Sequence, residues 1–151
     1  MPVQFVWRSD STPGVPPQDV IVALFGGSTA VAGTPVDGTV FIADRDYEVV
    51  KITEVHSVGT ASLTFDFRKC TGTTAPASGT SILTSTFDGN STANTVVTKT
   101  PGSGITATQA TRRLTTGDRL ALDETTAPTG YIGLIQIHLR PIQSSNDQIG
   151  F

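Results

Sequence analysis

The residues that could perform acid–base, nucleophilic or metal chemistry are few and widely spaced in this sequence. The chain contains two histidines, His56 and His138, and one cysteine, Cys70. The histidines show neither the HxH nor the HExxH spacing of a metal site. Cys70 could pair with a histidine as nucleophile and base, but no third group that would orient the base is suggested. We expect both histidines to be surface or hydrogen-bonded strand residues, and Cys70 to be a small, dispensable residue at a strand end.

Three acidic residues at alternate positions, Asp44, Asp46 and Glu48, are the best candidate for a calcium site. The run lacks the glycine and the later bidentate glutamate of a calcium-binding loop. A solvated hairpin turn therefore explains these carboxylates better than a metal site. Taken together, these histidine, cysteine and acidic residues form no recognisable catalytic or metal site. We therefore predict no catalytic residue, no metal ligand and no cofactor, and we expect that the protein is not an enzyme.

Length and composition favour a single all-β domain. The 151 residues include 15 Gly and 9 Pro, and only 15% of them are charged. A chain of this length normally forms one domain. No stretch repeats apolar residues at helical spacing for three turns, and Gly and Pro interrupt the chain at intervals typical of a sandwich or barrel.

Alternating apolar residues predict eight or so strands. In the strand expected at 47–58 the apolar alternation shifts by one position, which indicates a bulge or a bend between two sheets. The segment 81–87 is compatible with a short helix or an irregular strand. The other expected strands are 20–25, 39–43, 63–69, 95–99, 112–114, 119–122 and 131–142.

The last expected strand, 131–142, has the clearest pattern. Its apolar positions face the core, and its polar positions, Gln136, His138 and Arg140, face the other way; the apolar ones are Tyr131, Ile135, Ile137 and Leu139. The run RRLTTGDRLALD followed by GLIQIHLRP resembles the closing hairpin of jelly-roll domains. The predicted fold is a jelly-roll-like antiparallel β-sandwich with an extended N-terminal arm.

We divide the chain into three parts: an extended arm at 1–18, the sandwich at 19–142 and a polar tail at 143–151. In the arm, Val3, Phe5 and Trp7 share one side of an extended segment, and a Pro- and Ser-rich hinge follows them. One interpretation makes this row a docking element for a capsid or a neighbouring protomer, because Trp and Phe are favoured at interfaces. The alternative makes 4–8 an edge strand of the same sandwich. The tail is either disordered or a second docking element.

Charge and hydropathy favour neither nucleic acid nor membrane as a partner. The formal net charge is −3, and the only basic doublets are Arg68-Lys69 and Arg112-Arg113. No basic stripe of the kind that binds phosphate backbones is present. We expect no signal peptide and no membrane-spanning segment, since the apolar runs have the length of strands.

The segment from Ala61 to Asn94 joins a strand, a long loop of Thr, Gly, Pro, Ala and Ser, and a second apolar piece that ends at the turn Asp88-Gly89-Asn90. The order of the phrases DFRKCTGT, SGTSIL, STFD and TANTV resembles small structural proteins of tailed bacteriophages, the head decoration or cement proteins with a jelly-roll-like all-β domain. The resemblance extends from Gln18 to Ile142.

This resemblance implies a structural protein that binds the outer surface of a phage head and stabilises it. The implied partner is the major capsid protein, the implied oligomer is a homotrimer, and the implied location is the virion surface after synthesis in the host cytoplasm. One alternative is a carbohydrate- or host-receptor-binding β-sandwich module of a virion. Such a site needs exposed aromatic side chains beside Asp or Asn, and Asp46-Tyr47 is the best such pair.

Overall fold

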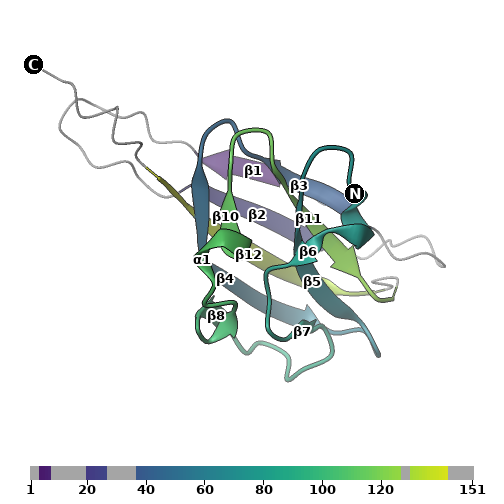
Figure 1. Ribbon diagram of the computed structural model, residues 1–151. Coiled ribbons are helices and arrows are strands. Elements are labelled where there is room, and N and C mark those ends of the chain that lie inside the picture. Colours follow the sequence, from purple (N-terminus) through teal and green to yellow (C-terminus); the bar gives the residue numbers. More distant parts are fainter. Residues whose placement is uncertain (1–3, 8–19, 27–36, 127–129, 143–151) are drawn as a thin grey trace, which may run out of the picture.

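The computed structural model describes residues 4–7, 20–26, 37–126 and 130–142, which form two β-sheets packed face to face (Figure 1). The larger sheet has the order β1-β2-β12-β4-β8-β9, with β10 also pairing with β4. Its strands are β1 (Gln4–Trp7), β2 (Val20–Gly26), β4 (Tyr47–Val58), β8 (Val97–Pro101), β9 (Gly104–Ile105), β10 (Arg113–Leu114) and β12 (Ile132–Pro141).

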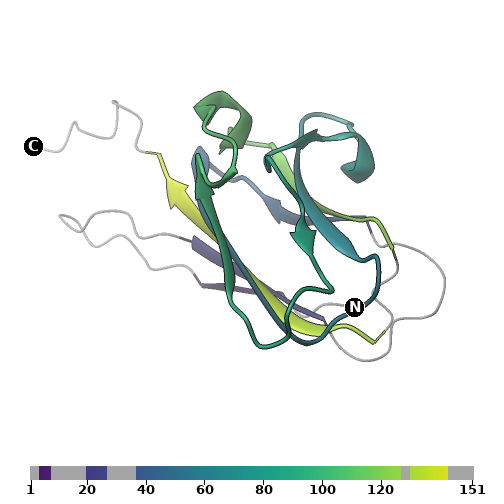
Figure 2. The ribbon, with the colours of Figure 1, turned by 90° about the horizontal axis from the view of Figure 1, so that it is seen from below.

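The smaller sheet has the order β3-β11-β5-β6, with β7 also pairing with β5. Its strands are β3 (Gly38–Ile42), β5 (Thr64–Cys70), β6 (Thr80–Ser81), β7 (Phe87–Asp88) and β11 (Arg119–Glu124). In Figure 2 the two sheets appear as separate layers, with β12 and β4 in one layer and β5 and β11 in the other.

The connectivity is that of a jelly roll. Successive long strands alternate between the sheets, so that β2, β4, β8 and β12 lie in the larger one and β3, β5 and β11 in the smaller one. Two sheets of four principal strands, β2-β12-β4-β8 and β3-β11-β5-β6, therefore face each other, as in two interlocked Greek keys. The predicted all-β sandwich is confirmed.

Apolar residues from both sheets fill the space between them. Phe65, Phe67 and Phe87 are among the largest fully buried side chains. The four core positions predicted on the last strand, Tyr131, Ile135, Ile137 and Leu139, are all buried, while Arg140 on the opposite face is exposed. Alternation along β12 therefore assigned the inner and outer faces correctly.

The shift of alternation predicted in 47–58 is a β-bulge. The pairing of β4 with β12 slips between His138, which lies opposite Lys51, and Leu139, which lies opposite Val49. Buried positions accordingly change from Tyr47 and Val49 to the set that begins at Ile52. Beyond the bulge, the inward positions are Ile52, Glu54 and His56.

Three local predictions need correction or refinement. Residues 81–87 are irregular strand, because only Thr80–Ser81 and Phe87–Asp88 pair with β5. The segment before 113 contains a single helical turn, α1 (Gln109–Arg112), and a 3₁₀ turn, η1 (Pro76–Ser78), precedes β6, although no helix was expected. One turn is too short to show helical periodicity in a sequence.

The turn after β3 is an inter-sheet corner and not a hairpin, since β3 and β4 belong to different sheets.

The N-terminal segment Gln4–Trp7 is an edge strand, β1, paired antiparallel with β2. Phe5 lies opposite Ala23 and Trp7 opposite Ile21. This is the arrangement of the edge-strand alternative for 4–8. Val3, the hinge and the tail 143–151 lie outside the described residues, so the division into arm, domain and tail stays a prediction.

Candidate functional site

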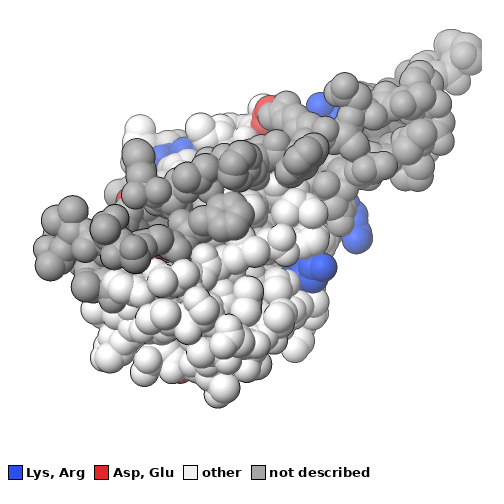
Figure 3. Space-filling model, turned by 180° about the vertical axis from the view of Figure 1, so that it is seen from behind, with Lys and Arg blue, Asp and Glu red and all other residues white. Residues whose placement is uncertain are grey.

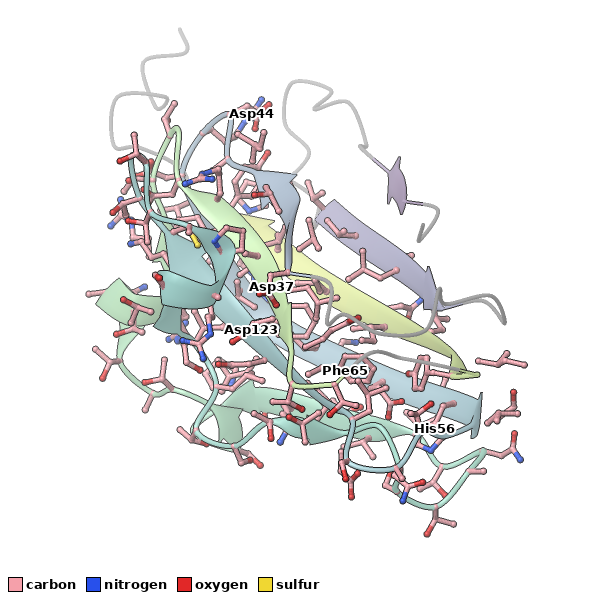
Figure 4. The ribbon with its side chains drawn as sticks, turned by 90° about the vertical axis from the view of Figure 1, so that its right-hand side faces the viewer. Asp37, Asp44, His56, Phe65 and Asp123 are labelled. Carbon is pink, nitrogen blue, oxygen red and sulfur yellow. The ribbon has the colours of Figure 1, made fainter. Side chains whose placement is uncertain are left out.

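A cluster of polar side chains lies inside the sandwich, where apolar residues would be expected. Glu54 is 0% exposed, His56 1% and Tyr131 3%. His56 and Phe65 lie near one end of the molecule, whereas the Asp44 corner lies at the other end (Figure 4). Polar groups this deeply buried are stable only when their hydrogen bonds are made.

The three side chains are joined through one oxygen atom. Glu54 Oε1 accepts a hydrogen bond of 2.7 Å from the Tyr131 hydroxyl and lies 2.7 Å from Nδ1 of His56. The other ring nitrogen of His56, Nε2, lies 3.0 Å from the carbonyl oxygen of Ser91. The second carboxylate oxygen, Oε2, is buried and accepts no hydrogen bond from the described residues.

These contacts favour a protonated His56. A carbonyl oxygen and an ionised carboxylate can only accept, so both ring nitrogens must donate to satisfy them. Burial lowers the pKa of His56, but its hydrogen bonds to Glu54 and Ser91 and the negative charges of Glu54 and Asp88 outweigh burial, and the pKa is raised. Burial, together with the hydrogen bond to Glu54, raises the pKa of Tyr131 far above its ordinary value.

The local sequence explains why these groups meet. The bulge in β4 gives Glu54 and His56 the same inward parity as Ile52. Gly133 lies opposite His56 on β12. A Cβ atom at Gly133 would collide with the ring and hydroxyl of Tyr131. The glycine therefore leaves the space through which Tyr131 reaches Glu54.

The cluster also holds the loop 89–96, which connects β7 to β8. His56 binds this loop twice: its ring contacts the Ser91 carbonyl, and its own carbonyl accepts a 2.6 Å hydrogen bond from the Asn94 amide. At the start of the loop, the Gly89 amide donates to Leu63, and a Cβ atom at Gly89 would lie 2.9 Å from the Leu63 side chain. The loop is therefore packed directly on the core at this end.

The outer surface of the larger sheet carries apolar residues beside this loop. Val55 lies opposite Leu134, and Val58 lies opposite Ile132, in the pairing of β4 with β12. The pairing of β8 with β4 begins at Val97, which lies opposite Glu54. Val96 precedes it at the end of the loop, where the same register, extended by one residue, would place Val96 level with Val55. We call these five residues, Val55, Val58, Val96, Ile132 and Leu134, the apolar face; Val96 is 62% exposed, Val58 46% and Ile132 41%.

Few charged side chains are visible among the described residues on this side of the molecule. Figure 3 views it from behind, where the described surface is mostly uncharged, with separate basic patches and acidic atoms only near the edges. The outward pairs next to the apolar face are polar but uncharged, such as Thr53 and Thr98, whose hydroxyls lie 3.3 Å apart. Exposed apolar residues grouped on a surface with few charges are typical of interaction sites.

A polar cleft between the η1–β6 segment and α1 has a different character. It has a volume of about 340 Å³ and is lined mainly by hydroxyl-bearing residues: Lys69, Thr71, Thr74, Ser78, Gly79, Thr80, Ala110 and Thr111. Lys69 is paired with Asp118 at 3.4 Å, so its charge is compensated. None of the lining residues is aromatic, whereas sugar sites generally use an aromatic face.

The other candidate residues lie apart from the buried cluster. Cys70 is buried, with Sγ 3.8 Å from the carbonyl oxygens of Ala75 and Pro76, as expected of a small residue at a strand end. His138 is half-buried on the outer face of β12. The two histidines and Cys70 are therefore not brought together.

The three carboxylates that were considered and rejected as a calcium site each have their own protein partner. Asp44 accepts from the Tyr47 hydroxyl at 2.7 Å, Asp46 pairs with Arg113 at 2.5 Å, and Glu48 pairs with Arg112. The hydrogen bond from Arg113 holds the pKa of Asp46 below its ordinary value. The described residues contain no group of three or more metal-ligating side chains.

The predicted docking residues are placed only in part. Phe5 and Trp7 lie on β1 at the edge of the larger sheet, and Val3 lies outside the described residues. Their docking role stays a prediction. Sequence reasoning missed Glu54 and Tyr131; the available signal was that Glu54 and His56 share the parity of Ile52 in a strand with a buried face.

No known family matches this chain, and no curated protein does. A solved structure described as "Structure of infectious bursal disease virus Gt strain" is similar over 95% of this chain and 38% of that chain, with 13% identity and a TM-score of 0.23. This chain therefore spans well under half the length of that one. A similarity of this size supports no conclusion about function. Among the described residues, no helix has the length and apolar character needed to cross a membrane.

Proposed function

We propose that this protein is a structural component of a bacteriophage virion that binds the outer surface of the head and stabilises it. The observation that carries the proposal is the apolar face on the larger sheet, which leaves Val58, Val96 and Ile132 substantially exposed. The resemblance of the segment 61–94 to decoration proteins supplies the class of partner, the major capsid protein.

The physical basis of stabilisation is preferential binding to the assembled shell. A protein that binds the expanded head, but not its separated subunits, lowers the free energy of the assembled state by mass action. A sandwich is well suited to this, because one sheet face can contact the shell while the opposite sheet keeps the fold rigid. The chemistry needed is burial of apolar area, and no catalytic group takes part.

The proposal includes a homotrimer as the solution state, as the resemblance implies. Several protomers that bind together gain avidity from their linked contacts with a symmetric shell. Sedimentation of the isolated protein should give the mass of a trimer at micromolar concentration. A stable monomer would contradict this part of the proposal.

The apolar face can be tested with one charge. In Val96→Asp, docking would bury an unpaired carboxylate, which costs several kcal/mol. We expect this variant to bind heads that lack the protein at least ~10-fold more weakly than the natural chain, a change of about 1.4 kcal/mol. The measurement is co-sedimentation with heads of the source phage, made without this protein.

Ile42→Asp is the matched control. Ile42 is 63% exposed, like Val96 at 62%, but it lies on β3 of the smaller sheet. This variant should bind heads within about twofold of the natural chain, because surface changes away from an interface have small effects. Both variants should keep the melting temperature of the parent. Docking through the apolar face would be contradicted if both variants lost head binding to the same extent, or if neither variant lost it.

The alternative is a module that binds carbohydrate or a host receptor. The Tyr47 ring of the Asp46-Tyr47 pair is buried and cannot stack on a sugar, so the cleft beside Lys69 is the location to test. A glycan array probed with the isolated protein tests it. Binding to glycans that Thr80→Ala or Thr111→Ala abolishes, with no binding to heads, would favour this alternative.

A further inference from the structure

Beyond a stabilising role for the buried cluster, its geometry points to a protonation-dependent clamp. We propose that protonated His56, held by Glu54, fixes the loop 89–96 against the sandwich, and that loss of its proton releases this loop. The loop carries Val96, so the clamp also sets the position of one side chain of the apolar face.

The first step is a count of donors and acceptors. The protonated ring has two N–H groups, and both are used, one at 2.7 Å from Glu54 Oε1 and one at 3.0 Å from the Ser91 carbonyl. A neutral ring has one N–H group, but two acceptors, Glu54 Oε1 and the Ser91 carbonyl, lie beside its nitrogens. Deprotonation therefore leaves one of the two acceptors facing a nitrogen lone pair.

The second step decides which acceptor loses its donor. Glu54 is fully buried, and its Oε2 accepts nothing from the described residues, so its charge depends on the two donors at Oε1. A buried carboxylate that loses a donor is destabilised far more than a carbonyl that can turn toward water. The remaining proton therefore stays on Nδ1, and the contact with Ser91 is the one that breaks.

The third step concerns the neighbouring charges. Among the described residues, the charged groups that act on His56 are Glu54 on β4 and Asp88 on β7, and those that act on Tyr131 are Glu54 and Glu124 on β11; all are acidic. Burial lowers the pKa of His56, but the hydrogen bonds to Glu54 and Ser91 and the charges of Glu54 and Asp88 outweigh burial and raise this pKa above its ordinary value of 6.5. The stability that this adds is fully present below pH 6.5 and is lost as the pH rises through the raised pKa.

Release should be local to the loop. At the β7 end the loop keeps the backbone bonds of Gly89 to Leu63 and Thr60, which do not involve His56. The middle of the loop depends on the His56 contacts to Ser91 and Asn94. Opening therefore affects residues 91–96 and leaves the two sheets intact.

Hydrogen exchange on the natural protein tests the clamp directly. After correction for the intrinsic rate, protection of the Asn94 amide should fall at least ~10-fold as the pH rises from about 6 to about 9, whereas Ala121 in β11 should change little. The ring resonances of His56 should titrate above 6.5 in the same samples. Equal pH dependence at Asn94 and Ala121, or titration of His56 below 6.5, would overturn the proposal.

Two variants separate the clamp from general effects of pH. In His56→Gln the protection of Asn94 should no longer depend on pH, while His138→Gln, which changes the other histidine, should keep the dependence of the natural chain. Persistence of the dependence in His56→Gln would overturn the clamp. Should His56→Gln fail to fold, the exchange and titration data on the natural chain still decide.

The effect on docking rests on the proposed function and is measured separately. Binding of the natural chain to heads should weaken on passing from about pH 6 to about pH 9, and His138→Gln should behave in the same way. A protein that binds heads at neither pH would contradict the proposed function, while the Asn94 data would still decide the clamp. Binding that is equal at both pH values would limit the clamp to the loop and overturn its role in docking.

Discussion

At the scale of single residues, the hydroxyl of Tyr131 is the contact that most clearly distinguishes a buried network from ordinary core packing. It donates to Glu54 Oε1 within a site closed to solvent. Removal of a donor to a buried charged group costs more than removal of one at the surface, because water cannot replace it.

Tyr131→Phe should therefore lower the free energy of unfolding by about 1–3 kcal/mol. The chain offers a control in its other tyrosine, since Tyr47 has a buried ring but donates to Asp44, an exposed residue. Tyr47→Phe should cost about 0.5–1.5 kcal/mol. Urea denaturation of both variants at neutral pH measures the difference. Equal losses would mean that the hydroxyl of Tyr131 has no special role.

Asp118 should contribute to stability on the acidic side of neutrality. Burial raises its pKa, but hydrogen bonds from the Thr115 amide and hydroxyl and the charge of Lys69 outweigh burial, and the pKa is lowered. Its contribution is present above the ordinary value of 3.8 and is lost as the pH falls through the lowered pKa. Asp118→Asn should be less stable than the parent by about 1–3 kcal/mol at neutral pH. At about pH 2 the difference should disappear. If the stability difference between Asp118→Asn and the parent persisted at about pH 2, the loss would come from the altered side-chain shape and not from the charge of Asp118.

At the scale of elements, Gly133 on β12 determines whether Tyr131, which directly precedes that strand, can keep its present position. A side chain at this position would meet the Tyr131 ring, so Gly133→Ala must displace either the ring or the strand. We expect a loss of about 1–3 kcal/mol, the range for overpacking. Gly38→Ala on β3 is the control, because a Cβ atom there meets nothing within 4 Å. Its effect should stay below about 1 kcal/mol. Thermal unfolding of both variants provides the comparison.

The elements differ in how well sequence alone predicts them, and the reason is length. Strand 47–58 was predicted with its true limits, because twelve residues show both the alternation and its shift at the bulge. Of the two-residue strands, Arg113–Leu114 falls within the predicted strand 112–114, whereas Gly104–Ile105 was not predicted. Two residues carry no period, and their pairing depends on the strand beside them.

The site was harder to predict for a related reason. The parity of β4 places Glu54 and His56 inside, but Tyr131 lies 77 positions from Glu54 and reaches it only because β12 lies beside β4. That pairing is a property of the jelly roll and of its register. The apolar face has the same origin, since Val55 and Leu134 meet through the pairing of β4 with β12, and Val96 directly precedes β8, the next strand in the sheet.

At the scale of the whole molecule, the N-terminal segment has two predicted roles that truncation can separate. β1 pairs with β2 along Gln4–Trp7, so deletion of residues 1–11 removes an edge strand and should lower the melting temperature. An edge strand contributes less than a central one, and the sandwich should remain folded. Weaker head binding by the truncated protein, measured well below its melting temperature, would support docking by Phe5 and Trp7. An unchanged melting temperature would contradict the contribution of β1 to the sheet.

The alternation of strands between the two sheets has a consequence for how the chain folds. β12 lies between β2 and β4, so these two strands cannot be joined in one sheet until residues 132–141 have been synthesised. Few strands can form a stable local hairpin, and loops must close over long distances before contacts compensate for the lost entropy. Folding should therefore be slow, on the scale of milliseconds to seconds, and should follow the release of β12 from the ribosome. Until then β2 and β4 lack their shared partner β12, although β1 can pair with β2 and β8 with β4, and nascent chains of this protein should depend on chaperones that bind exposed strands.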